Sequence, residues 1–260
     1  MVEYIHERVQ HMLQTIATEK QVRILYACES GSRAWGFASA DSDYDVRFFY
    51  ARPRDAYLQL DSPRDVIEVP VVDELDISGW DIFKALSLLR KSNPPLLEWL
   101  FSPVVYLEQS PAIETLRGLA KELYSPAAMF YHYRHMAGGN YRQYIQGKDD
   151  VLVKKYLYVL RPIVALLYLE QRQEVPPTDF VMTLNCVEMS EDAEKHIYRL
   201  IVQKRRGDEL GMGKPSSLLN EFIENHLHRW QTVKPETHKS QQFTQRLNEV
   251  LHSILQENPW

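Results

Sequence analysis

Two spacings of apolar residues alternate along the first hundred positions of the chain. Over residues 2–21 apolar side chains recur every three or four positions, which predicts an amphipathic helix. Over residues 22–27 and 44–50 they form short runs next to polar turns, which predicts strands. Helical spacing returns over residues 80–91, until Ser-Asn-Pro-Pro ends it. Shorter elements are predicted at residues 33–38 (helix), 56–60 (helical turn), 66–72 (edge strand), 96–101 (helix) and 102–106 (extended).

Strand patterns nearly vanish after residue 111, and helical spacing dominates the rest of the chain. The pattern changes between residues 107 and 125, so we predict two domains, residues 1–110 and 111–260. The expected fold class is α+β, with a mixed sheet flanked by helices and then an all-α domain. The helices of the second domain are expected at residues 125–146, 150–172, 190–206, 215–230 and 237–256.

Composition narrows the class of protein. The 260 residues carry a net charge of −5 and a pI near 6.0, which argues against a broad surface for non-specific DNA binding. Cys28 and Cys186 stand far apart without a partner motif, so neither a disulfide framework nor a zinc site is expected. Charged residues interrupt residues 1–25, and no apolar run reaches membrane-spanning length. We therefore expect a cytoplasmic protein with no membrane partner.

Two aspartates lie at the start of the second predicted strand. Asp43 and Asp45 flank Tyr44, and an extended backbone points both carboxylates to one face, about 6 to 7 Å apart. A hard divalent cation, Mg²⁺ or Mn²⁺, relieves their repulsion because it takes oxygen ligands. Arg47 continues the same face and can pair with these acids or touch a nucleotide, and we favour the ion pair. The aspartates therefore predict a metal site.

A Gly-Ser pair precedes these aspartates. Gly31 and Ser32 open a predicted helix, where backbone N–H groups and the helix dipole favour a phosphate. Eleven positions separate Ser32 from Asp43, enough for a short helix and a turn before the next strand. If that strand runs beside the first, the phosphate-binding turn and the metal site come together. Arg33 can then contact phosphate or lie on the surface, and the pattern favours neither.

A two-metal site needs a third acid. Asp76 is the best candidate because Leu75 and Ile77 enclose it in an apolar, strand-like segment. Asp73 and Asp81 are the alternatives. The sequence therefore predicts three aspartates from two separate segments at one site.

Residues 125–172 carry seven lysines and arginines against three acids. Charge on a helix usually marks a solvated face, but opposite an acidic metal site it can also hold a triphosphate. Lys154 and Lys155 are candidates for that role. Arg134 and Arg142 alternate with tyrosines on another predicted helix, where packing is favoured over base stacking.

Three stretches carry a resemblance to a known family. They are GSRAWGFASADSDYDVRFFY, LDISGWDIFKALSLLRKSNPPLLEWLFSP and KKYLYVLRPIVALLYLE, in this order. Together they resemble the DNA polymerase β-type nucleotidyltransferase superfamily, and within it the YcgL-like, RNA-ligase-associated group of predicted nucleotidyltransferases. The resemblance covers roughly residues 20–230.

The resemblance implies a polymerase β-like minimal nucleotidyltransferase domain, followed by helices that close over the nucleotide. Asp43 and Asp45 would hold both metal ions. Asp76 would hold the catalytic metal and orient or deprotonate the attacking hydroxyl. The implied reaction is in-line attack of an acceptor hydroxyl on the α-phosphorus of an NTP, with release of pyrophosphate.

For the nucleotide, the resemblance implies that Gly31 and Ser32 hold the β- and γ-phosphates of an NTP such as ATP. It also favours Lys154 or Lys155 at the γ-phosphate. The acceptor stays open between an RNA terminus, which the association with RNA ligases suggests, and a protein or small molecule, which the acidic pI suggests. A hypothesis of another class is a nucleotide sensor that binds an NTP without catalysis.

Overall fold

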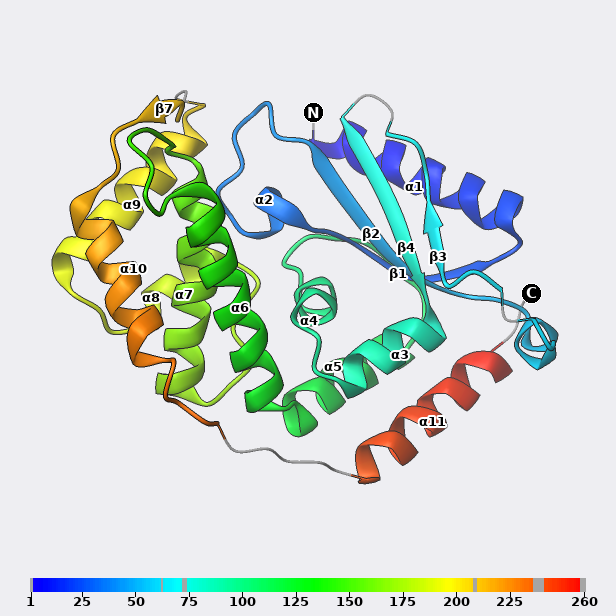
Figure 1. Ribbon diagram of the computed structural model, residues 1–260. Helices are drawn as coiled ribbons and strands as arrows, with labels where there is room; N and C mark the ends of the chain where they lie inside the picture. Colours follow the sequence, from blue (N-terminus) through cyan, green and yellow to red (C-terminus); the bar gives the residue numbers. More distant parts are fainter. Residues whose placement is uncertain (1, 62, 72–73, 208–209, 236–240, 258–260) are drawn as a thin grey trace. The chain divides into compact units, whose positions relative to one another are not determined.

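A five-stranded mixed sheet occupies the first part of the chain, and helices make up most of the remainder (Figure 1). The computed structural model describes residues 2–61, 63–71, 74–207, 210–235 and 241–257. The chain forms two compact units, which we call the sheet unit and the helical unit. The sheet unit comprises Met1–Ala34, Asp43–Tyr124 and Lys239–Trp260, and the helical unit Trp35–Ser42 and Ser125–His238.

The sheet has the strand order β3-β4-β2-β1-β5. β2 and β4 are parallel, whereas the other neighbouring pairs are antiparallel. This mixed sheet confirms the predicted α+β class. The strands are β1 (Arg23–Glu29), β2 (Tyr44–Ala51), β3 (Val66–Glu68), β4 (Leu75–Asp81) and β5 (Val105–Glu108).

One face of the sheet packs on α1. Leu13 and Ile16 of α1 join Val46 and Phe48 of β2 in one buried cluster. Side chains alternate along a strand, so the residue after Phe48 points to the other face of the sheet. There Phe49 packs beside Trp99. The helices of this unit are α1 (Val2–Lys20), α2 (Gly31–Ala34), α3 (Ile82–Arg90), α4 (Pro94–Leu100), α5 (Ala112–Leu123) and α11 (Gln241–Gln256), with a 3-10 turn over Arg54–Leu58.

Several predicted boundaries were wrong. The helix expected over residues 80–91 begins at Ile82, because Trp80 and Asp81 still pair within β4 and the Asp81 carboxylate caps the Phe83 N–H. The helix expected over residues 33–38 is the four-residue α2. The edge strand expected over residues 66–72 ends at Glu68, and position 72 lies outside the described residues. No helix was predicted at α5 or at α8 (Phe180–Asn185).

The helical unit is built around α6 and α7, which pack along each other. Residues 150–154 do not begin α7, because Val151 and Leu152 form the short strand β6 (Val151–Leu152) against β7 (Met212–Gly213). Trp230 is fully buried and its indole N–H donates to Glu170 over 2.7 Å. The helices are α6 (Pro126–Tyr144), α7 (Lys155–Arg172), α8, α9 (Glu191–Arg205) and α10 (Ser217–Arg229).

The segment Trp35–Ser42, which we call the anchor segment, packs within the helical unit although it lies between α2 and β2 in sequence. Phe37 is buried edge-on against Phe180. The Arg205 guanidinium donates to the Gly36 carbonyl over 2.7 Å, and Lys204 donates to the Ser39 hydroxyl over 2.8 Å. The helical unit therefore holds the chain that joins the Gly-Ser turn to the aspartates.

The boundaries of these units differ from those of the predicted domains, residues 1–110 and 111–260. α5 and α11 belong with the sheet, and the anchor segment belongs with the helices. The units describe packing, whereas the domain prediction assigns a catalytic part and a nucleotide-closing part, and it stays a prediction. Among the helices of the described residues, none has both the length and the apolar character needed to cross a membrane.

Candidate active site

Two of the predicted carboxylates come from neighbouring parallel strands. The register of β2 and β4 places Asp45 opposite Asp76, and adjacent strands lie about 4.8 Å apart. Asp43 precedes β2 by one residue and raises the pKa of Asp45 electrostatically, as does Asp76. The structure therefore brings the three predicted aspartates together at one end of the sheet.

Arg47 lies between two of these acids. Its Nη2 is 3.1 Å from Asp45 Oδ1 and 2.7 Å from Asp76 Oδ2. Its Nη1 donates to the Asp76 carbonyl over 2.9 Å, and only 16% of the side chain is exposed. The favoured prediction of an ion pair is confirmed, and the guanidinium neutralises part of the repulsion between the acids.

Gly31 lies directly against Asp45. Its φ is +60°, and a Cβ at this position would lie 1.9 Å from Asp45 Oδ2. The Ser30 N–H also donates to the Asp45 carbonyl oxygen over 2.8 Å. Only glycine meets both demands, the left-handed backbone and the close approach. The Gly-Ser turn and the aspartates are therefore adjacent, and Ser32 follows Gly31 in the single turn of α2.

Arg33 is held beside the same acids. Its Nε donates to the Asp43 carbonyl oxygen over 3.2 Å, and its guanidinium lies 3.7 Å from the centre of the Tyr44 ring. Both contacts fix the side chain at the edge of the site. A role in phosphate contact stays a prediction.

Glu29 is a buried acid that holds the backbone of Asp45, a role that the sequence pattern did not predict. The side chain is buried, and its Oε1 accepts the Asp45 N–H over 2.7 Å. The Tyr106 hydroxyl donates to Oε2. Burial raises the pKa of Glu29 to about 7. An acid at the end of a buried strand, directly before a Gly-Ser turn, is the signal that could have drawn attention to it.

The electrostatics of Asp45 suit a cation. Burial raises its pKa most, Asp76 and Asp43 raise it further, and Arg47 opposes them. The three carboxylates offer the oxygen donors that Mg²⁺ or Mn²⁺ prefers. Within the described part of the chain, no group of three acidic, histidine or cysteine side chains forms a ready metal cage. As they are placed here, the three carboxylates do not enclose a cation by themselves, so a bound Mg²⁺ or Mn²⁺ would need further ligands such as water and substrate phosphate.

Asp81 has a different role from Asp76. It is 2% exposed, its Oδ1 accepts the Phe83 N–H over 2.9 Å and its Oδ2 accepts the Tyr57 hydroxyl over 3.0 Å. These bonds make it the cap of α3, at the opposite end of β4 from Asp76. Asp73 lies outside the described residues. Among the candidates that the structure describes, Asp76 is the one beside Asp45.

The two predicted triphosphate lysines belong to the helical unit. Lys154 is exposed, directly before α7. The Lys155 ammonium lies 4.4 Å from the ring centre of Tyr144 and 4.8 Å from that of Tyr158, so the two aromatic faces already hold its charge. Their binding of a nucleotide stays a prediction.

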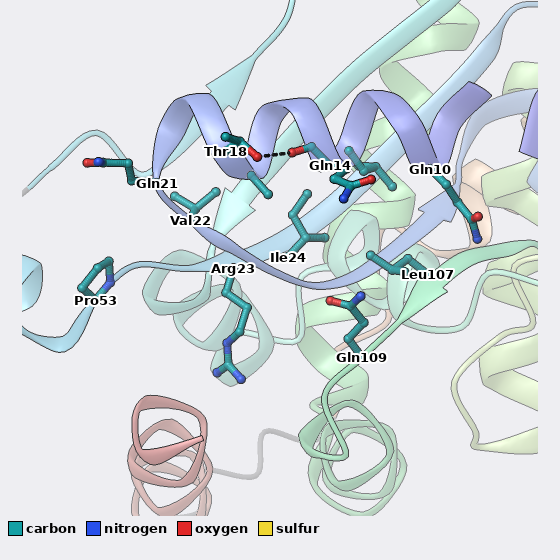
Figure 2. A pocket seen from close by; sticks show the side chains of 12 residues that line it. Gln10, Gln14, Thr18, Gln21, Val22, Arg23, Ile24, Pro53, Leu107 and Gln109 are labelled. Atoms are coloured by element: carbon teal, nitrogen blue, oxygen red, sulfur yellow. Dashed lines mark hydrogen bonds between the residues drawn. The ribbon is translucent and has the colours of Figure 1, made fainter. Parts of the chain in front are cut away.

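A hollow of about 840 Å³ lies apart from the aspartates, along α1 (Figure 2). Amide side chains rim it, including Gln10, Gln14 and Gln109, above a floor that includes Val22 and Ile24. No carboxylate or predicted site residue belongs to its lining. Metal chemistry therefore points to the end of β2 and β4 and not to this hollow.

The chain is similar to known proteins over nearly its whole length. The model of RlaP, the RNA repair pathway DNA polymerase beta family, matches residues 5–253. The "Uncharacterized protein YcgL" of Bacillus subtilis (strain 168) is 42% identical over 252 residues, which cover 96% of each chain. A crystal structure of a nucleotidyltransferase-like protein from Exiguobacterium sibiricum 255-15 aligns with a TM-score of 0.35 and 11% identity, over 95% of this chain and 80% of that one.

Proposed function

Since the chain belongs to the RNA repair pathway DNA polymerase beta family, we propose that it is a metal-dependent nucleotidyltransferase. The family indicates nucleotidyl transfer in general. The finer proposal is transfer of a nucleoside monophosphate from an NTP such as ATP to an acceptor hydroxyl, with release of pyrophosphate. The observation that carries it is the parallel register of Asp45 with Asp76, next to the close approach of Gly31.

In this proposal Asp43, Asp45 and Asp76 hold one or two Mg²⁺ or Mn²⁺ ions. The bound cation supplies positive charge to the phosphates and lowers the pKa of the attacking hydroxyl. Asp76 is the most exposed of the two strand acids, with 40% of its side chain accessible against 29% for Asp45. It is therefore more accessible to the acceptor's hydroxyl, although Arg47 pairs with both carboxylates; Asp45 is also held through its backbone N–H, which donates to Glu29.

The nucleotide is assigned to the turn beside these acids. The N–H groups of Gly31 and Ser32 hold the β- and γ-phosphates, and Arg33 adds charge from the edge of the site. Lys154 or Lys155 contributes from the helical unit, with exposed Lys154 the better donor because Lys155 is engaged by tyrosine rings. We keep the cytoplasm, which the distant cysteines suggested, as the proposed location.

For the acceptor we propose an RNA terminus, since the matching family is described by RNA repair. A protein or small-molecule acceptor is the alternative. A nucleotide sensor without catalysis is a second candidate, and the observation that favours it is the Arg47 guanidinium at two of the three acids. A sensor binds NTP but releases no pyrophosphate with any acceptor.

The test is transfer from labelled NTP in the presence of Mg²⁺ or Mn²⁺, with RNA, protein and small-molecule acceptors in parallel. Asp43→Asn and Asp45→Asn should each reduce transfer by at least about 100-fold, because the removed charges hold the cation. Asp55→Asn is the matched control, as Asp55 is an exposed acid of the same unit. Transfer that survives both site variants contradicts the assignment.

The role of Asp76 as the third metal ligand is tested by comparing alanine substitutions at Asp76 and at Asp81. Asp76→Ala should abolish most transfer, again by about 100-fold. Asp81→Ala should leave the acid cluster in place but lower the free energy of unfolding by about 2 kcal/mol, because it removes a helix cap and a buried partner of Tyr57. Denaturant unfolding beside the transfer assay separates the two effects, and full activity of Asp76→Ala rules out its role.

A further inference from the structure

A basic pocket lies between α6 and α10, within the helical unit. Its volume is about 470 Å³. Arg134, His135 and Arg142 line it from α6, and Glu224 and His228 line it from α10. Two arginines and two histidines thus surround a space of the size that small-ligand sites occupy.

The arginines are held in the pocket wall. Arg134 donates to the Trp230 carbonyl over 3.0 Å and stacks on Tyr131. Arg142 reaches back along α6, where a Cβ on Gly138 would lie 3.4 Å from its Nη1. Because Gly138 is four residues earlier on the helix, its missing side chain leaves room for the guanidinium.

Some basic residues of the helical unit form ion pairs, whereas the two arginines of this pocket do not within the part of the chain that the structure describes. Lys195 pairs with Glu191, Lys214 with Asp150 and Arg229 with Glu170. Over the described residues, neither Arg134 nor Arg142 forms an ion pair. The acid of the lining, Glu224, accepts a hydrogen bond of 2.5 Å from the Tyr141 hydroxyl instead.

The chemistry of this lining fits phosphate. A guanidinium presents two parallel N–H donors that match phosphate oxygens. His135 donates from Nδ1 to the Tyr131 carbonyl over 2.6 Å, so its Nε2 donates to a phosphate only when the ring is protonated. An open pocket of this size with a few basic groups has room for one or two phosphates of a strand, whereas a duplex needs a long basic surface. The net charge of −5 also disfavours such a surface.

We propose that the pocket between α6 and α10 binds the phosphate backbone of single-stranded RNA. That this strand is the acceptor rests on the proposed function, but binding itself does not. Arg142 is the main phosphate ligand, Arg134 and His135 assist, and the neighbouring Tyr131 ring offers a face on which a base can stack. The proposal assigns an RNA site to a unit that carries none of the three aspartates.

The test is fluorescence anisotropy of a labelled single-stranded RNA of about twelve nucleotides, without NTP or divalent metal. Arg142→Gln should weaken binding at least fivefold at about 50 mM salt and reduce the salt slope by about 0.7, the value of one phosphate contact. Arg142→Lys should recover part of the affinity. Arg199→Gln is the control, since Arg199 is an exposed arginine on α9 of the same unit, and thermal unfolding verifies that each variant is folded.

Several outcomes overturn the proposal. The first is equal RNA affinity of Arg142→Gln and Arg199→Gln, and the second is no RNA binding by the unmodified chain. The third is that NTP displaces the RNA and that Arg142→Gln also loses affinity for NTP, which would make the pocket a nucleotide site. The double variant Asp43→Asn with Asp45→Asn separates the two hypotheses. If it binds RNA normally while no form of the protein transfers nucleotide, the proposed function fails and the RNA site stands. If the unmodified protein transfers nucleotide and Arg142→Gln binds RNA as tightly as the unmodified protein, the RNA site fails and the proposed function stands.

Discussion

The sheet unit and the helical unit hold their charges in opposite ways. In the sheet unit, backbone register sets Asp45 beside Asp76, and a largely buried Arg47 joins them. In the helical unit, Arg134 and Arg142 line an open pocket, and Arg142 is exposed. Strand register fixes the acids through backbone hydrogen bonds, whereas the arginines of the pocket lie on a helix, where only side-chain contacts position them. The first suits a fixed catalytic geometry and the second suits a variable ligand.

The same glycine substitution in each unit tests this contrast most strongly. Gly31→Ala should reduce transfer by about 100-fold or more, because its Cβ would meet Asp45 at 1.9 Å and displace the carboxylate. Gly147→Ala, also at positive φ but with nothing within 4 Å of its Cβ, should cost about 1 kcal/mol of stability and leave transfer intact. Kinetics and chemical denaturation measure both effects. Equal losses of transfer would remove the special status of the Gly31 turn.

Removing one arginine from each unit should give a smaller difference. Arg47→Met leaves Asp45 and Asp76 without their shared cation, so the free energy of unfolding should fall by about 2 kcal/mol. Mn²⁺ should restore more stability to this variant than to the unmodified chain, because metal binding favours the folded state. Arg142→Met should change stability by less than about 0.5 kcal/mol. The measurement is the unfolding temperature of each variant with and without Mn²⁺. An Arg47→Met protein whose unfolding temperature does not change with Mn²⁺ contradicts a metal site at these acids.

The smallest predicted effect concerns pH. Burial, and next to it Arg229, lowers the pKa of His226 from 6.5 to about 4. As pH falls from 6.5 towards 4, the unfolded chain takes up this proton first, so stability falls in that window and is regained as pH rises. The expected change is below about 1 kcal/mol, since the ring is partly exposed.

His226→Phe keeps the ring contacts with Phe222 and Trp230 and should flatten the pH profile of the unfolding temperature between pH 4 and 6.5. His252→Gln is the control, because His252 is exposed on α11 of the sheet unit. A profile that His226→Phe leaves unchanged would assign the pH dependence to other groups.

Much of the sheet unit could be predicted from local pattern. Alternation along a strand predicted that Asp43, Asp45 and Arg47 share a face, and the ion pair of Arg47 confirms the favoured interpretation. The pairing of Asp45 with Asp76 could not be derived, because strand order is a long-range property. The buried Glu29 escaped notice for a related reason. Its partners, the Asp45 N–H and the Tyr106 hydroxyl, come from two strands on either side of β1.

The helical unit could be predicted as helices but not as a site. Spacing placed Arg134 and Arg142 on one helix, and it gave no information on Glu224 and His228, which α10 brings opposite them. The two lysines at residues 154–155 were expected within a helix, and Lys155 is the first residue of α7, whereas Lys154 is its N-cap just after the β6 strand. No local pattern showed that the backbone N–H of Phe180 donates a hydrogen bond to the carbonyl oxygen of Trp35. Contacts between distant segments decide each of these features.

The anchor segment has a consequence for how the protein is made. Residues 35–42 leave the ribosome long before α8 and α9, the helices that bind them through Phe180, Lys204 and Arg205. The sheet unit must likewise wait for α11, which packs on α3 and α5. Domains usually fold one after another during synthesis, but here neither unit is a continuous piece of chain. We therefore expect the helical unit to be completed only after α10 is made and the sheet unit only after α11, and no single cut in the gene to yield either unit whole.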